Sequence, residues 1–252
     1  MKTNFFKIYG IGLLVLTVFY SLPKAGLAAE LLNVSDLKPR EMSSLYFDRA
    51  MGYQNSRFRV VSLVDAINRV DSGSGVDALV LRCRDDYEGI IRFDEIRRYD
   101  LQLATEINID LKFKRPSWLQ AGLLLVPDGS DAPPMERFMT ANIEAIYLAR
   151  SAEYFAPLDE VGGNHPAAMP GSRVYKQNCI FCHRLKGVGG NKGGALLDKF
   201  DFSSGSSVAM ETAFLNFHHK MNEDKQNVEQ FVSRSALHEV GVFLSILFSD
   251  SR

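Results

Sequence analysis

The residues best suited to chemistry in this chain are Cys179, Cys182 and His183, within the sequence Cys-Ile-Phe-Cys-His. Two residues between the cysteines, in one turn of helix, bring both thiols to the same side. The histidine that follows directly adds an imidazole nitrogen, a common metal ligand. This spacing predicts covalent attachment of a heme, because two thiols can add to its two vinyl groups while the imidazole binds the iron.

Three other interpretations of the same motif compete with heme attachment. A thioredoxin-like redox pair is typical of a βαβ pattern, and no such pattern surrounds Cys179. A structural zinc site needs two more ligands at metal spacing, and the sequence has no second C-x-x-C. A plain disulfide between Cys179 and Cys182 is uncommon at this spacing. The third cysteine, Cys83, follows Leu79 and Leu81 at strand spacing, so we expect it to be a small buried apolar residue.

The first residues predict export of the chain. Lys2 and Lys7 precede an apolar run over residues 8–22, and small residues at 25–28 fit a peptidase site. We therefore expect a signal peptide at residues 1–28, cleaved after Ala28. The apolar run is short for a membrane span, which takes roughly 20 residues, although an uncleaved anchor is the alternative. No later stretch reaches spanning length, so we expect no membrane span after cleavage and a periplasmic location.

Composition and charge exclude several classes of protein. The chain has 252 residues, of which 46% are hydrophobic and 23% charged, as in an ordinary globular protein rather than a disordered one. Its formal charge is −1, which gives no reason to expect a nucleic-acid partner. Cleavage after Ala28 would remove three lysines and no acids, leaving 26 basic and 30 acidic residues in 224, a formal charge of −4.

The chain divides by composition into three parts after the signal peptide. Residues 29–158 mix short strands and helices, which predicts an α+β domain with a mixed sheet. They include a capping box at Ser62, a buried strand over 76–84, a short helix over 93–99 and an alternating strand over 106–113. Residues 159–170 are rich in glycine and proline, which indicates a linker. Residues 171–252 are predicted to be helical at both ends.

This last part resembles a class I c-type cytochrome domain, over about 80 residues. Gly171 and Tyr175 precede the heme motif, a glycine-rich loop over 187–196 follows it, and an apolar face predicts a final helix over 234–248. The resemblance implies an all-α domain in which Gly171 and Tyr175 meet Gly241 and Phe243 where the first and last helices cross. It also implies that a loop carbonyl accepts the ring N–H of His183. The proline usual in that loop is replaced by Gly194.

The resemblance further implies a sixth iron ligand opposite His183. In the family it is a methionine on the loop before the last helix, and Met221 occupies that place, followed by Asn222 where relatives usually have proline. His218, His219 and Met210 are the alternatives, with an open coordination position as another. Adjacent residues on a helix point about 100° apart, so His218 and His219 cannot both face the iron.

A second resemblance concerns the α+β part. It looks like the core of a sulfite-oxidase-type molybdopterin domain in its apolar segment over 78–81, the turn at 85–89, the Val126-Pro127 turn and the segment over 142–146. We expect a shortened version of that fold, without molybdenum. In that family a cysteine upstream of the buried strand binds molybdenum, and no cysteine occurs between Ala29 and Val80. A molybdenum cofactor is therefore not expected.

Together these features predict a periplasmic monoheme c-type cytochrome. It would pass electrons between a partner such as a periplasmic dehydrogenase and a downstream acceptor such as another cytochrome, with the α+β part used for docking. An acidic mature chain favours a basic partner surface. The alternative is a heme-containing molybdenum oxidoreductase with its active site in the α+β part, although no acid–base pair or nucleophile constellation is visible in the sequence.

Overall fold

The computed structural model describes residues 27–71, 75–203, 205, 207–218 and 232–250. Within them, eight strands form two four-stranded sheets in which every neighbouring pair is antiparallel. The first sheet has the order β1 (Leu27–Leu31), β8 (Ile143–Ala149), β4 (Ala78–Cys83), β5 (Glu88–Arg92). The second has the order β2 (Arg40–Met42), β3 (Arg57–Ser62), β6 (Gln102–Asn108), β7 (Leu123–Leu125).

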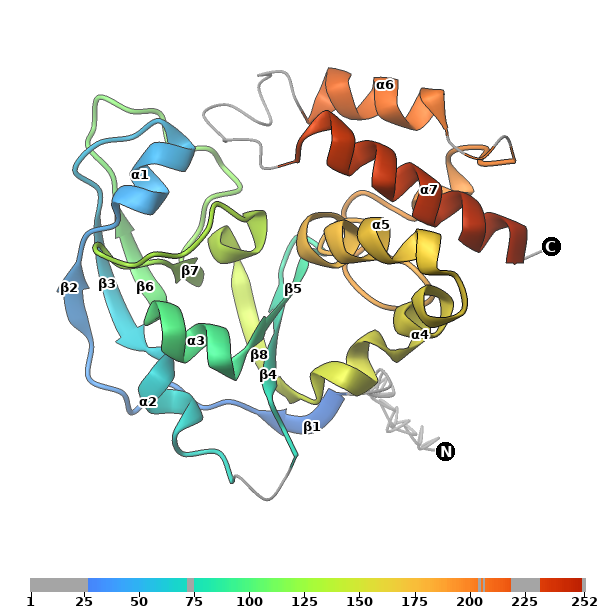
Figure 1. Ribbon diagram of the computed structural model, residues 1–252. Helices are drawn as coiled ribbons and strands as arrows, with labels where there is room; N and C mark the ends of the chain where they lie inside the picture. The colour runs from blue at the N-terminus through green and yellow to red at the C-terminus, as the bar shows by residue number, and fades with distance from the viewer. Residues whose placement is uncertain (1–26, 72–74, 204, 206, 219–231, 251–252) are drawn as a thin grey trace, which may run out of the picture.

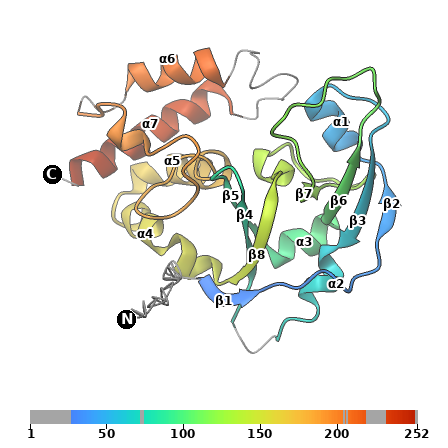
Figure 2. The same ribbon diagram turned by 180° about the vertical axis from the view of Figure 1, so that it is seen from behind.

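Helices cover these sheets on different sides. The early helices are α1 (Leu45–Met51), α2 (Leu63–Ile67) and α3 (Phe93–Tyr99). The later helices are α4 (Ser151–Asn164), α5 (Met169–Val174), α6 (Val208–Phe217) and α7 (Arg234–Asp250). In Figure 1 the later helices gather on one side of β4 and β5, and the second sheet lies on the other side. The view from behind in Figure 2 shows the same order of layers.

Strand β4 is buried on both faces, which explains its continuous apolar sequence. Successive side chains of a strand point to opposite faces. Leu79, Leu81 and Cys83 belong to a core shared with α2, α3 and β6. Ala78 and Val80 belong to a second core, which they share with the later helices. The prediction that Cys83 is a buried small residue is confirmed, because only 3% of it is exposed.

The predicted fold class is wrong in two respects. The expected mixed sheet is instead two antiparallel sheets. The expected all-α cytochrome domain is not a distinct unit, because its residues share one continuous core with β4, β5 and β8. The physical reason is that the apolar face of this sheet needs a cover, and the later helices provide it. The continuous apolar sequence of β4 indicates that both of its faces are covered, but it does not indicate which helices cover them.

Several local predictions are confirmed, and one strand was misplaced. Ser62 caps α2 by accepting a hydrogen bond from the amide of Asp65 at 3.1 Å. Helix α3 has the predicted bounds. The strand expected over 106–113 is instead β6, which ends at Asn108, where its partner β3 begins at Arg57. Leu111, expected on the buried face, is fully exposed. An alternating sequence forms a strand only as far as a partner strand accompanies it.

The residues predicted as a linker, 159–170, lie in α4, in a short 3₁₀ turn over Pro166–Ala168 and in the start of α5. Most of the predicted signal peptide, residues 1–26, lies outside the described residues. Among the described residues, no helix is both long and apolar enough to cross a bilayer.

Candidate functional site

The cysteine–histidine motif begins where α5 widens into a π-helical turn over Tyr175–Cys179. The chain then turns back on itself, and the amides of Cys182 and His183 both donate to the carbonyl of Cys179, at 3.2 and 2.9 Å. The two intervening residues, Ile180 and Phe181, are fully buried. Cys179 and Cys182 are half-buried, and neither is in a disulfide. Their backbone thus forms the single turn of helix that heme attachment requires.

His183 is oriented by the loop that follows it. Its Nδ1 lies 3.0 Å from the carbonyl oxygen of Gly194, and because a carbonyl can only accept, Nδ1 carries the proton. In a neutral imidazole, Nε2 then carries the lone pair that a metal would take. This is the loop-carbonyl contact that the cytochrome resemblance implied, and the replacement of proline by Gly194 has preserved it.

Gly193 lies directly against the imidazole. A Cβ atom built on it would stand 2.3 Å from Cε1 and 2.6 Å from Nδ1 of His183, far inside contact distance. Its amide donates to the carbonyl of Cys182 at 2.7 Å, and its own carbonyl accepts from the Lys199 ammonium at 2.6 Å. A residue without a side chain is therefore needed at this position for the loop to approach the histidine ring.

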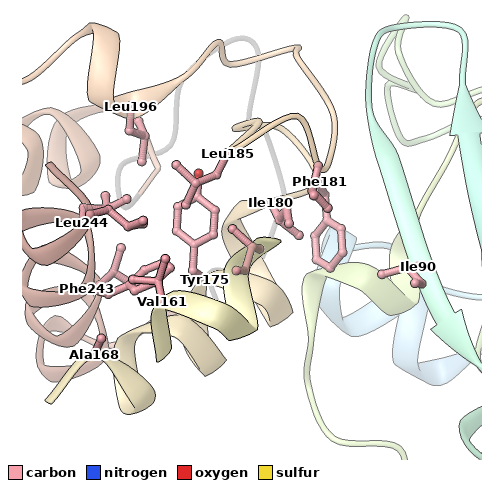
Figure 3. Close-up of a cluster of buried hydrophobic side chains, with 14 of the residues drawn as sticks. Ile90, Val161, Ala168, Tyr175, Ile180, Phe181, Leu185, Leu196, Phe243 and Leu244 are labelled. Carbon is pink, nitrogen blue, oxygen red and sulfur yellow. The ribbon is translucent and has the colours of Figure 1, made fainter. Parts of the chain in front are cut away.

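The motif is joined to the first sheet by backbone hydrogen bonds. The amide of Glu88 donates to the carbonyl of Phe181 at 3.0 Å, and the amide of Asn191 donates to the carbonyl of Asp86 at 2.7 Å. The ring of Tyr87 stacks on that of Phe181 with centroids 5.7 Å apart. Figure 3 shows the Phe181 side chain directed toward Ile90 of β5. The turn between β4 and β5 therefore forms one wall of the site.

On the other side, α7 crosses α5 behind the motif. A Cβ atom on Gly171 would stand 1.9 Å from the carbonyl oxygen of Glu239, so the two backbones are in direct contact. The ring of Tyr175 meets that of Phe243 edge-on, with centroids 5.8 Å apart (Figure 3). The hydroxyl of Tyr175 donates to the carbonyl of His183 at 2.5 Å. The cytochrome resemblance implied that Gly171 and Tyr175 meet Gly241 and Phe243, and the contacts with Phe243 are confirmed.

The thiol of Cys179 is in an environment that keeps it protonated. Burial, with a smaller contribution from Glu136, raises the pKa of Cys179 to about 12. A dithiol redox centre works through a thiolate whose pKa is lowered. The environment of Cys179 therefore disfavours the thioredoxin-like interpretation. Within the described part of the chain, no group of three or more His, Cys, Asp or Glu side chains is placed to hold a metal ion.

The candidates for the sixth ligand are only partly described. Met221 and His219 lie outside the described residues. Met210 is buried on α6, where it joins the core shared with the first sheet. His218, at the end of α6, has its ring centroid 6.1 Å from that of His183. His165 and His238, to which the sequence assigned no role, lie near Asp250 and Glu211.

Sequence reasoning missed one buried polar pair beside the motif. The hydroxyl of Tyr154 on α4 donates to a carboxylate oxygen of Glu88 at 2.8 Å, and the two residues are only 2% and 4% exposed. Burial and the neighbouring carboxylate of Glu88 raise the pKa of Tyr154 well above its usual value. Strand periodicity could have found Glu88, because it shares a face of β5 with the buried Ile90.

Comparison with known proteins adds no relative. The chain matches no protein-family model, and neither a curated protein nor a solved structure is significantly similar to it. Both family resemblances drawn from short motifs therefore stay predictions. The site itself consists of two cysteines one helical turn apart that form no disulfide, and an imidazole whose orientation is fixed by Gly193 and Gly194.

Proposed function

We propose that this chain is a periplasmic electron-transfer protein that holds one heme c covalently through Cys179 and Cys182, with His183 as an iron ligand. The observation that carries the proposal is the His183 Nδ1 contact with the Gly194 carbonyl in a chain that also has the complete C-x-x-C-H motif. This contact leaves the Nε2 lone pair for a metal and fixes the direction of the ring.

The residues of the site fit a heme group chemically. Each protonated thiol can form one bond from sulfur to a vinyl carbon, and its hydrogen goes to the neighbouring carbon, so that no oxidant is needed. The raised pKa of Cys179 is compatible with this addition, because the thiol keeps the hydrogen that has to be transferred. Apolar side chains that pack around the motif, including Tyr175, Leu185 and Leu196, would exclude water from a bound macrocycle.

When bound, the heme iron supplies reversible one-electron chemistry between its ferric and ferrous states. The role of the protein is to hold the heme and to limit the movement of the surrounding side chains when the charge of the iron changes. Gly193 and Gly194 hold His183, and Tyr175 anchors the His183 carbonyl from behind. Electrons would pass to and from partner proteins such as a periplasmic dehydrogenase or another cytochrome, whose basic surfaces would complement the acidic mature chain.

The test is heme attachment in three variants of the exported protein, in each of which one cysteine is replaced by alanine. Cys179→Ala and Cys182→Ala should each lose a thioether, which shifts the α-band of the reduced pyridine hemochrome away from its c-type position. Cys83→Ala is the matched control, because Cys83 lies in another core and should leave that band unchanged. A wild-type protein without a c-type hemochrome would overturn the proposal.

Metal analysis of the same preparation separates this function from the molybdenum alternative. We expect about one iron per chain and no molybdenum. Molybdenum in a similar ratio to iron would instead favour an oxidoreductase whose active site lies in the α+β part.

A further inference from the structure

One imidazole in the described structure lies next to that of His183. His218 follows the last residue of α6, and its amide donates to the carbonyl of Phe214 at 2.7 Å. Its ring centroid is 6.1 Å from that of His183, and the two ring planes are inclined by 69°. The two residues are 35 positions apart in the sequence, so only the tertiary fold brings the rings together.

The separation of the two ring centroids is compatible with one metal atom bound between the rings. A metal–imidazole nitrogen bond is about 2 Å long, which puts the metal about 3 Å from the ring centre. Two imidazoles on opposite sides of one metal therefore have ring centres about 6 Å apart. The inclination of the planes is no obstacle, because each ring can turn about its own metal–nitrogen bond.

Aromatic neighbours hold His218 in this position. The ring of Phe214 stacks on the imidazole with centroids 5.0 Å apart and planes 24° apart. The ring of Phe217 meets it edge-on, also at 5.0 Å. Helix α6 is itself fixed at its start, where the Ser207 hydroxyl accepts from the amide of Met210, and by the buried side chain of Met210. The ring of His218 is thus positioned by the end of α6 and by the rings of Phe214 and Phe217.

We propose that His218 is the sixth iron ligand, so that the heme of the proposed function is held between two histidines. The inference rests on the proposed function, since it assigns the second axial position of the same heme. It replaces Met221, which the cytochrome resemblance implied. Two imidazoles stabilise ferric iron more than an imidazole and a thioether do, so the chain would work at a lower reduction potential than a methionine-ligated cytochrome. Its electron donor must accordingly be a strong reductant.

The test is the absorption and electron paramagnetic resonance of the ferric, heme-loaded full-length protein and four variants. Wild-type protein should be low-spin and lack the weak red band of a thioether bound to ferric iron. His218→Ala should become high-spin, and added imidazole should restore the low-spin spectrum. Met221→Ala and His219→Ala are controls and should match wild type. His218→Met, which keeps a ligand at this position, should gain the thioether band and a higher midpoint potential.

Each other outcome has a definite meaning. A thioether band in wild-type protein that disappears only in Met221→Ala would overturn the inference and restore the methionine. A low-spin His218→Ala spectrum identical to that of wild type would also overturn it. If His218→Ala does not fold, the thioether band in His218→Met decides the question. Absence of any c-type heme from wild-type protein would refute the proposed function, a result distinguishable from a different axial ligand.

Discussion

At the scale of single residues, the site depends on how closely the backbone of Gly193 and Gly194 approaches the His183 ring. The Cys179, Cys182 and His183 motif is readable in the sequence because its residue types and spacing are local, and the heme that we propose for it stays a prediction. The contact of His183 with a loop carbonyl was implied by the cytochrome resemblance, and Gly194 supplies that carbonyl. His218 was only one of several alternative ligands at the sequence level, because its distance from His183 depends on where α6 lies. The Tyr154–Glu88 pair was missed for the same reason, since its partners lie on different elements.

Replacing Gly193 with alanine should displace His183. The added Cβ would stand 2.3 Å from the imidazole, so the ring or the loop must move. We expect a loss of about 1–3 kcal/mol in the free energy of unfolding, measured by denaturant titration, together with an altered ferric heme spectrum. Gly187→Ala is the control for the heme spectrum: its strain at φ +80° costs a similar amount of stability, about 1–2 kcal/mol, but nothing lies within 4 Å of its added Cβ, so the spectrum should match that of wild type. An unchanged heme spectrum in Gly193→Ala would contradict this account of the loop.

Replacing Tyr154 with phenylalanine should destabilise the wall of the site. The change removes the hydroxyl that donates to the buried carboxylate of Glu88, at an expected cost of about 1–3 kcal/mol in the free energy of unfolding. Tyr99→Phe is the matched control, because the Tyr99 hydroxyl makes no hydrogen bond to the described residues, and it should change stability by less than about 0.5 kcal/mol. Equal effects of the two changes would argue against a structural role for the Tyr154–Glu88 pair.

Two buried tyrosines predict a loss of stability in alkali. Burial raises the pKa of Tyr154 and of Tyr175 well above the value of about 10 for a free tyrosine. Above pH 10 the unfolded chain loses these protons while the native protein keeps them, so the free energy of unfolding falls as pH rises. Each tyrosine contributes a slope of about 1.4 kcal/mol per pH unit. Denaturant titrations between pH 8 and about pH 11 measure this, and Tyr154→Phe should show a shallower fall; an equally steep fall would exclude Tyr154 as a source.

At the scale of elements, local patterns predicted α3, β4 and α7 well, because each is bounded by its own capping, turn or apolar signals. The prediction of a strand over 106–113 was wrong because the alternation of apolar and polar residues continues past Asn108, where the partner strand β3 begins at Arg57. The crossing of α5 and α7 at Gly171, Tyr175 and Phe243 was implied by the cytochrome resemblance, and the structure shows that Gly171 leaves no room for a side chain there.

Replacing Gly171 with alanine should separate α5 from α7. The added Cβ would stand 1.9 Å from the Glu239 carbonyl oxygen and 2.7 Å from the Cβ of Phe243, so one helix must move. We expect a cost of about 1–3 kcal/mol in the free energy of unfolding, seen as a lower melting temperature by circular dichroism. The exposed Arg173, on the same helix, is the control, and Arg173→Ala should change stability by less than about 0.5 kcal/mol. If Gly171→Ala has the same melting temperature as wild type, α5 and α7 can move apart at little cost, which would contradict this prediction.

At the scale of the whole molecule, the prediction of a separate helical domain around the cysteine–histidine motif is wrong, because these residues share a core with the first sheet. A resemblance confined to residues 171–252 predicts the helices of that segment, but it does not predict which other parts of the chain pack against them. The apolar faces of β4 and β5 pack against Tyr154, Ile180 and Phe181 in one core. The sequence of either part alone does not identify its partner, because apolar surface is not specific to one neighbour.

The shared core predicts that residues 171–252 do not fold alone. Such a fragment would expose the surface that Val80 and Ile90 cover in the full chain, and it would lose the hydrogen bond from Glu88 to Phe181. Circular dichroism of the fragment should show no cooperative thermal unfolding, whereas the full chain should show it. A fragment that melts cooperatively and carries heme would support an independent domain.

The central claim is that Cys179 and Cys182 carry a covalent heme, and mass spectrometry of the exported protein tests it most directly. We predict that the denatured, intact chain exceeds the mass of the polypeptide from residue 29 by that of one heme, and that after proteolysis the added mass stays on the peptide containing residues 179–183. A polypeptide of unmodified mass, obtained from cells that attach heme to a known cytochrome c in parallel, would contradict the account.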